Sequence, residues 1–292
     1  MLRLPGYGAS GAAIAVAGLM LTARFASAGV LQSFQQTGQI DLELVAAGGQ
    51  GAIPPNGTFN LTQVNGPVVK STFYANDWNN GGAGIDLDFN GNSVATTGPF
   101  ASDIALAASM YTYQWDVTPC VAGPGSYTYT VGPTTVGNLF AVPAMALAVV
   151  YQDPSGPTRQ VTILEGAQQV GETGSETENF TFAGMLAGPT SVSVLTGFDD
   201  NSSSAGEQAT YNGTFVGGPF DKALGLNATL TNGTATSLTG TNGLSVSTGS
   251  DHFGVVLSSA VVTVPGPPAG ALAIPGVAVL TLCACRRRWR RA

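Results

Sequence analysis

The sequence predicts an all-β protein made of two related β-sandwich units of jelly-roll or immunoglobulin-like type. A signal helix precedes them and a C-terminal transmembrane helix follows them. Three observations support this. Short runs alternate between apolar and polar residues, and Gly, Asn and Pro bound them, as in half-buried strands. Only 9% of the residues are charged, and 40 of the 292 are Gly. No convincing amphipathic helical pattern occurs, which favours a sandwich architecture.

The first 28 residues have the pattern of a secretory signal peptide. Arg3 supplies the positive charge, and Gly11–Leu21 is the apolar core of the signal. Ala26 and Ala28 are the small residues of a cleavage site, so the mature chain is expected to begin at Gly29. An uncleaved anchor is the alternative interpretation.

Residues 29–264 follow as an ectodomain of strands. Met145–Tyr151 is a continuous apolar run, which predicts a central strand buried on both faces. Four other runs alternate in the period of a half-buried strand: Ile40–Leu44, Ile85–Phe89, Tyr127–Val131 and Val192–Leu195.

A weak internal repeat divides the ectodomain. Phe89-Asn90-Gly91 and Tyr211-Asn212-Gly213 each place an aromatic residue before an Asn-Gly turn, which is a hairpin signal. Gly-Pro-Phe follows each turn, at 98–100 and 218–220. We therefore expect a first sandwich at 29–155 and a second at 156–264, although Asn-Gly pairs also arise by chance in this composition.

A second set of motifs resembles a known family. Phe89-Asn90-Gly91, Trp115–Val121 and the stretch Leu147–Pro154 with Arg159 occur in this order. The order is similar to a domain of unknown function that recurs in bacterial and archaeal secreted surface proteins. The resemblance covers roughly residues 68–216. It implies an extracellular sandwich without known catalysis.

The charge balance restricts the partners of the ectodomain. It contains 17 acidic residues and only three basic ones, Lys70, Arg159 and Lys222, so its formal charge is −14. Such a surface repels nucleic acid and favours solubility and cation binding.

Cys120 is alone in the ectodomain, so no disulfide forms within it; we expect a small buried side chain there. The single histidine, His252, is expected at the surface.

One acidic stretch matches the start of a calcium loop. Asp86, Asp88 and Asn90 lie at alternate positions before Gly91, and such hard oxygen ligands suit Ca²⁺. Position twelve is Thr97 rather than Glu, so this is no EF-hand. Two interpretations remain: a calcium site, or a strand whose acids face water before an Asn-Gly turn.

The sequence contains no motif of a known catalytic class. It lacks a G-x-S-x-G elbow, a P-loop, an H-E-x-x-H motif and a zinc-type Cys cluster. Acid pairs such as Asp86/Asp88 or Glu176/Glu178 could serve a glycosidase, but acids two apart on a strand usually share a solvated face. Trp78, which we expect in an Asn/Gly-rich loop, could stack on a sugar ring. We predict that the protein is not an enzyme.

The last 29 residues combine three features. After the linker Val264-Pro265-Gly266-Pro267-Pro268, residues 269–285 carry no charge, and five arginines follow. A helix of that length would just cross a thin bilayer, with the arginines on the cytoplasmic side. A plain C-terminal anchor is one interpretation. The arginines that would stop translocation are Arg286, Arg287, Arg288, Arg290 and Arg291.

This tail resembles the PEP-CTERM sorting signal of Gram-negative and planctomycete surface proteins. The motif is Val264-Pro265-Gly266-Pro267, with Gly266 where the family has Glu. The resemblance implies an exosortase-like protease and the inner membrane as partners, and exopolysaccharide as a further one. It predicts an exported, non-enzymatic cell-surface or matrix protein with a structural or adhesive role. The alternatives are a carbohydrate- or calcium-dependent binding module and, less favoured, a secreted hydrolase.

Overall fold

The structure is a computed structural model, and nearly all of its regular structure is strand. Apart from strands β1 to β18, the described residues include one short 3-10 helix, η1 (Thr118–Cys120). The all-β prediction is therefore confirmed. The structure describes residues 29–48, 56–79, 85–96, 99–101, 109–133, 144–171, 176–197, 206–220, 228–249 and 252–265.

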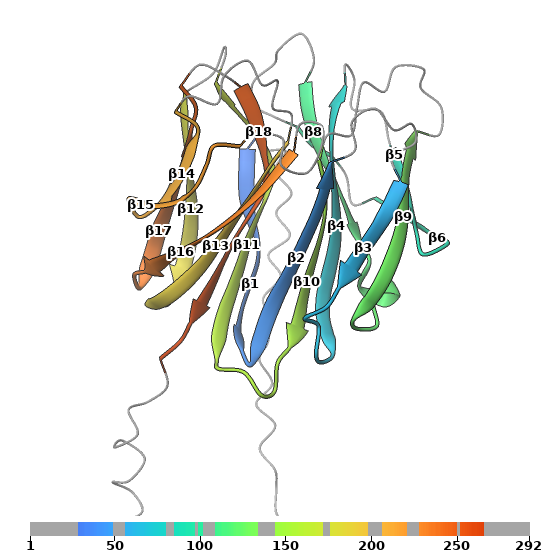
Figure 1. Cartoon of the computed structure of the whole chain (residues 1–292), viewed down its shortest axis with the longest axis horizontal. Helices are drawn as coiled ribbons and strands as arrows, with labels where there is room; N and C mark the ends of the chain where they lie inside the picture. The colour runs from blue at the N-terminus through green and yellow to red at the C-terminus, as the bar shows by residue number, and fades with distance from the viewer. Residues whose placement is uncertain are drawn as a thin grey trace, which may run out of the picture.

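The first sandwich packs a five-stranded sheet against a four-stranded sheet (Figure 1). The larger sheet has the order β2 (Ile40–Gly48), β10 (Ala144–Gln152), β4 (Val68–Asn79), β8 (Ser109–Asp116) and β7 (Pro99–Ala101). The smaller one has the order β3 (Asn56–Leu61), β9 (Gly125–Pro133), β5 (Ile85–Phe89) and β6 (Asn92–Val94).

The second sandwich also packs five strands against four. Its larger sheet has the order β1 (Gly29–Gly38), β11 (Arg159–Gly171), β18 (His252–Thr263), β13 (Gly188–Gly197) and β16 (Ala228–Ser237). Its smaller one has the order β12 (Thr177–Met185), β17 (Gly240–Ser247), β14 (Gln208–Tyr211) and β15 (Thr214–Gly217).

The two sandwiches share one topology. The order β2-β10-β4-β8 in one large sheet corresponds to β11-β18-β13-β16 in the other, and β3-β9-β5-β6 corresponds to β12-β17-β14-β15. Taken in chain order, β2 to β10 and β11 to β18 therefore form two repeats. The additional strand β1, which precedes both repeats, pairs antiparallel with β11.

The two Asn-Gly hairpins are equivalent in detail. Asn90 and Gly91 have φ of 52° and 75°, and Asn212 and Gly213 have 50° and 78°, the left-handed pair that a tight hairpin turn needs. The Oδ1 atom of Asn90 accepts a hydrogen bond from the Thr128 N–H at 2.7 Å. Asn212 Oδ1 likewise accepts from the Gly243 N–H at 3.0 Å. Each turn is thereby tied to the neighbouring strand of its sheet.

Each sandwich has its own hydrophobic core. The first is rich in aromatic side chains, among which Phe73 contacts both Phe89 and Trp115 edge-on. In the second, Phe182 and Tyr211 pack edge-on, and Phe220 packs against Phe253. Alternation explains these cores, because Ile85, Leu87 and Phe89 of β5 point inward while the acids between them face water.

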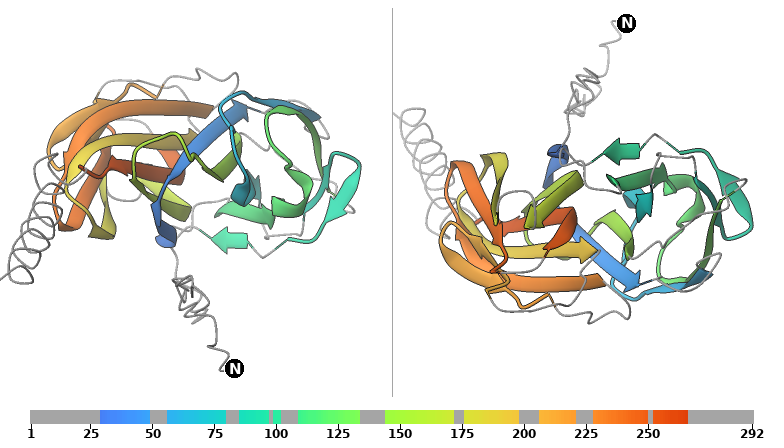
Figure 2. Two further views of the ribbon diagram at one scale, coloured as in Figure 1. Left: turned by 90° about the horizontal axis from the view of Figure 1, so that it is seen from below. Right: turned by 90° about the horizontal axis from the view of Figure 1, so that it is seen from above.

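The two large sheets lie back to back (Figure 2). A third apolar layer fills the space between them. On β10, Met145, Leu147 and Val149 enter the first core, whereas Ala146 and Ala148 enter this middle layer. The prediction that Met145–Tyr151 is buried on both faces is confirmed. Small side chains let the sheets approach closely: a Cβ added at Gly197 would lie 2.8 Å from the Ala144 Cβ.

Two adjacent chain connections cross from one large sheet to the other. One runs from β1 into β2, and the other from β10 into β11. The predicted division near residue 155 lies in the second connection, between Gln152 and Arg159. The end of β18 is at the same place, since Thr263 pairs with Arg159 and the Val264 N–H donates to the Thr158 carbonyl at 2.9 Å. We call this end of the molecule the crossover end.

Candidate functional site

An ion cluster joins the two repeats at the crossover end. The Nη1 atom of Arg159, at the start of β11, lies 2.9 Å from Asp153 Oδ2 and 3.2 Å from Asp41 Oδ2. The hydrogen bond from Arg159 is the main reason why the pKa of Asp153 lies below its usual range. One guanidinium thus bridges a carboxylate at the start of β2 and one in the connection from β10 to β11.

Polar contacts hold Asp153 in place from several directions. Its Oδ1 atom accepts hydrogen bonds from Asn65 Nδ2 at 3.3 Å and Ser155 Oγ at 3.2 Å. Its backbone N–H donates to the Gln39 carbonyl at 2.8 Å. Gly156 is required by close approach, because a side chain there would collide with the Asp153 carboxylate. The cluster of Asp41, Asp153 and Arg159, which we call the junction, is therefore a structural brace in which two carboxylates share one guanidinium.

A second polar contact crosses the middle layer. The Tyr74 hydroxyl on β4 donates to Glu165 Oε2 on β11 at 2.6 Å, and both residues are buried. Desolvation by burial raises the pKa of Glu165 and raises that of Tyr74 well above its usual value. Such a short bond to a carboxylate is a strong directional contact, and it fixes the two sheets relative to each other.

In each repeat, a polar side chain on the first strand braces a distant segment through hydrogen bonds. The Glu43 carboxylate accepts hydrogen bonds from the backbone N–H groups of Thr62, Gln63 and Val64. In the second repeat, the Gln160 side chain donates to the Gly184 carbonyl and accepts from the Leu186 N–H. Sequence analysis missed both residues, and it also missed Glu165. The available signal was a polar residue among apolar neighbours, which indicates a buried polar group that needs partners.

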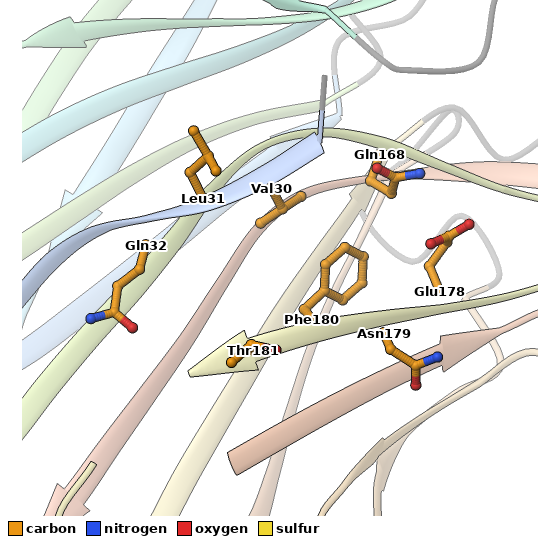
Figure 3. A pocket seen from close by; sticks show the side chains of 8 residues that line it. All are labelled: Val30, Leu31, Gln32, Gln168, Glu178, Asn179, Phe180 and Thr181. Atoms are coloured by element: carbon orange, nitrogen blue, oxygen red, sulfur yellow. The ribbon is translucent and has the colours of Figure 1, made fainter. Parts of the chain in front are cut away.

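An open groove lies between the edges of the second sandwich, where β1 and β12 face each other (Figure 3). Its volume is about 390 Å³, which is within the range of small-ligand sites. Val30 and Phe180 give it an apolar floor, and polar side chains surround them. The lining residues are Val30, Leu31, Gln32, Gln168, Glu178, Asn179, Phe180 and Thr181.

The groove ends where two glutamines bridge the sheet edges. Gln32 Oε1 accepts from the Ala183 N–H at 2.9 Å, and Gln35 Nε2 donates to the Ala183 carbonyl at 2.7 Å. These contacts satisfy both outward backbone groups of Ala183 on β12. Among the lining residues Glu178 is the only acid, whereas a glycosidase normally needs two facing carboxylates.

The predicted calcium ligands lie on the outer face of the first sandwich. Asp86 and Asp88 are exposed on β5, and Asp88 Oδ1 accepts from the Gly91 N–H at 2.8 Å. The Asn90 side-chain oxygen is bonded to Thr128. In the described part of the chain no three His, Cys, Asp or Glu residues are grouped so that they could hold a metal. A calcium site therefore remains a prediction.

Three other predicted features differ in detail. Trp78 is in strand β4, where its backbone pairs with Met110, rather than in a loop. His252 begins β18 as a buried residue, 7% exposed, and not a surface one. Cys120 is half-buried in η1 and packs on the first core.

The targeting segments lie largely outside the described residues. This applies to Ala26 and Ala28 of the signal peptide and to Gly266 and Pro267 of the tail motif. It also applies to Arg286, Arg287, Arg288, Arg290 and Arg291. Val264 and Pro265 are described and directly follow β18. In the described ranges no helix is long and apolar enough to span a membrane. Export and sorting remain predictions.

Comparison with known proteins identifies a family but no activity. No curated protein matches the sequence. A solved structure that resembles this chain is a β-porphyranase of glycoside hydrolase family 86 from the human gut bacterium Bacteroides plebeius, with 14% identity and a TM-score of 0.25. The match covers 76% of this chain and 34% of that one, so the chain spans about a third of the enzyme's length.

So low a TM-score carries no conclusion about activity. The family model matches residues 53–249, a range that includes the motifs from Phe89 to Arg159 on which the resemblance rests. Because the match extends over residues 53–249 of the 292-residue chain, the protein belongs to the DUF3344 family of proteins of unknown function.

Proposed function

We propose that this is an exported, non-enzymatic cell-surface or extracellular-matrix protein with a structural or adhesive role. The observation that carries the proposal is the junction. Arg159 forms ion pairs with both Asp153 and Asp41 where the two repeats join, and Glu165 is bonded to Tyr74 between the sheets. The polar groups named here brace two sandwiches into one block instead of converging on a substrate.

The predicted tail gives this block an orientation. The segment that leaves β18 starts at the crossover end, where the Val264 N–H is bonded to Thr158. An anchor following Pro265 would place that end toward the membrane and the opposite end outward. The acidic, Lys-poor composition suits an exported protein and disfavours nucleic acid and anionic lipid as partners.

The test follows the full chain in a bacterium that encodes an exosortase. Membrane fractionation and protease treatment of intact cells locate the protein, and mass spectrometry defines both ends. Replacing the arginines at 286–291 with Ser should abolish retention, because charges on that side set the orientation. Replacing Lys222 with Ser removes a cation outside both targeting segments and serves as the matched control. Cytoplasmic, protease-resistant wild-type protein would contradict the proposal.

The groove supports a second candidate, a carbohydrate-binding module. Gln168, Glu178 and Asn179 surround Phe180 in a space of sugar-ring size, as in many polar-rimmed ligand sites. Glu178→Gln and Asn179→Ala should weaken retention on neutral exopolysaccharide, while Glu176→Gln outside the lining should not. Equal retention by all four proteins would remove this candidate. Repeating the assay with a chelator tests whether calcium contributes.

A further inference from the structure

The equivalent first strands of the two repeats, β2 and β11, differ in whether another strand pairs with their outer edge. On β11 every residue from Gln160 to Gly171 is buried, because β1 pairs along its outer edge. On β2 only Ile40 and Glu43 are buried, and the rest are half-exposed. No strand among the described residues pairs with the outer edge of β2, which begins its sheet. The position that β1 fills in the second repeat is thus not filled by any described strand in the first.

The backbone groups on this open edge can be assigned from the register. The Asp153 N–H donates to the Gln39 carbonyl, and residues 39 and 153 continue the β2–β10 register. Odd-numbered residues of β2 therefore direct their backbone groups toward β10, and even-numbered ones direct them outward. Consistently, the Leu42 N–H is not in the ladder but bonds to Asp41 Oδ1 at 2.9 Å. Leu44, Ala46 and Gly48 present the next outward donors and acceptors.

The composition of this edge is unusual for an outer strand. Natural edges commonly carry charges or other groups that prevent pairing. The outer strand β1 exposes Gln32, Gln35 and Gln36, and two of these glutamines block the β12 edge. After Glu43, β2 instead has the uncharged sequence Leu-Val-Ala-Ala-Gly. Leu44 packs on the middle apolar layer and Val45 packs on the first core, yet both side chains stay half-exposed.

We propose that β2 pairs antiparallel with β2 of a second copy of this chain. Pairing centred on Leu44 places Leu42 opposite Ala46 and Glu43 opposite Val45, so no two acids are directly opposed. The alternation then brings apolar side chains together on both faces. The result joins two five-stranded sheets into one continuous sheet around a two-fold axis. This inference rests on the edge geometry and not on the proposed surface role.

The net charge predicts how this dimer responds to salt. Each ectodomain has a formal charge of −14, so two copies repel each other at low ionic strength. Salt screens this repulsion and strengthens apolar contacts. Dimerisation should therefore increase with ionic strength, opposite to an interface held by ion pairs.

The experiment is sedimentation velocity on the full chain in mild detergent, with Ala46→Pro as the test variant. The Ala46 N–H points outward, so Pro removes a donor of the proposed interface without breaking the β2–β10 ladder. The dissociation constant should rise by more than about tenfold, with the melting temperature unchanged. Ala47→Pro is the matched control: it removes a ladder donor and should lower the melting temperature.

Hydrogen exchange identifies the interface independently of the predicted tail. In the dimer the amides of Leu44 and Ala46 should exchange slowly, whereas in the Ala46→Pro monomer the Leu44 amide should exchange fast. A wild type that stays monomeric near 1 M salt would overturn the proposal. So would a dimer that forms equally in Ala46→Pro, or slow exchange at Leu44 in a proven monomer, which would mean that the chain covers its own edge.

Discussion

The two repeats have the same strand order but are completed in different ways. In the second repeat, β1 extends the large sheet, covers β11 and contributes Val30 and Phe34 to two apolar layers. In the first repeat the same edge, on β2, has no such cover among the described residues. A strand from the start of the chain thus stabilises its last repeat. The second repeat therefore depends on a strand from outside its own sequence, and no described strand covers the equivalent edge of the first repeat.

The largest effect should follow deletion of residues 30–37, which removes most of β1. The second sandwich would lose apolar burial and the two glutamine bridges, on the order of 3–5 kcal/mol for two large side chains. Hydrogen exchange should rise in β11 and β12 and stay low in the first core. Leu31→Ser is the control, since Leu31 is exposed. A uniform rise in both sandwiches would contradict the asymmetry.

A matched pair of aromatic residues tests whether the two cores are equivalent. Phe89 and Tyr211 precede the two Asn-Gly turns, and each is fully buried in its own core. Replacing either with Ala should cost about 3–5 kcal/mol in denaturant unfolding. Tyr211→Phe should cost only about 1 kcal/mol, because it removes the hydroxyl contact with Ser237 Oγ at 2.7 Å. A small loss for one Ala variant would mean that its core tolerates collapse better.

Short-range patterns allowed much of this fold to be predicted. Alternation in Ile85–Phe89 identified the inward and outward faces of β5, and the run Met145–Tyr151 identified a strand covered on both sides. The Asn-Gly pairs identified two turns that share one geometry. Each of these signals depends on residues that are neighbours in the sequence.

The remaining features depend on contacts between distant segments. Nothing local in Gly29–Gly38 indicates that β1 pairs with β11 beyond residue 159. Likewise, the junction and the Glu165–Tyr74 contact each join residues far apart in the chain. The groove was missed for the same reason, since β1 and β12 form it together. The alternate spacing of Asp86 and Asp88 suggested a calcium site, whereas the structure places both residues on an exposed strand face.

Removing the junction should separate the unfolding of the two repeats. Arg159→Met leaves Asp41 and Asp153 unneutralised beside each other, so calorimetry should show two transitions instead of one. The folded-state pKa of Asp153 is lowered, so its contribution to stability is present above its unfolded pKa and is lost as pH falls through the folded value. The variant should lose that acid sensitivity. A single transition at every pH would mean that the middle layer alone couples the repeats.

The contact between Glu165 and Tyr74 should respond to pH in the opposite direction. Burial raises the folded-state pKa of Glu165, so its contribution is present below its unfolded pKa of about 4.3 and is lost as pH rises through the folded value. Glu165→Gln keeps an oxygen for the Tyr74 hydroxyl without the buried charge. Its melting temperature should therefore exceed that of the wild type increasingly toward neutral pH. A constant difference across pH would show that Glu165 does not titrate in this range.

The smallest effect tests the strongest symmetry in the molecule. Gly91 and Gly213 have φ of 75° and 78°, and a Cβ added at either meets nothing within 4 Å. Gly→Ala therefore adds no clash at either turn, and its cost is conformational, about 1–2 kcal/mol for an L-residue in the left-handed region. Because the backbone angles and the Asn hydrogen bonds match, the two losses should agree within about 0.5 kcal/mol in denaturant unfolding. Unequal losses would mean that the two repeats differ in their hairpins as well as in their sheet edges. The difference in stability would then have to come from the turn conformation or from the unfolded chain, because an added Cβ meets no neighbour at either site.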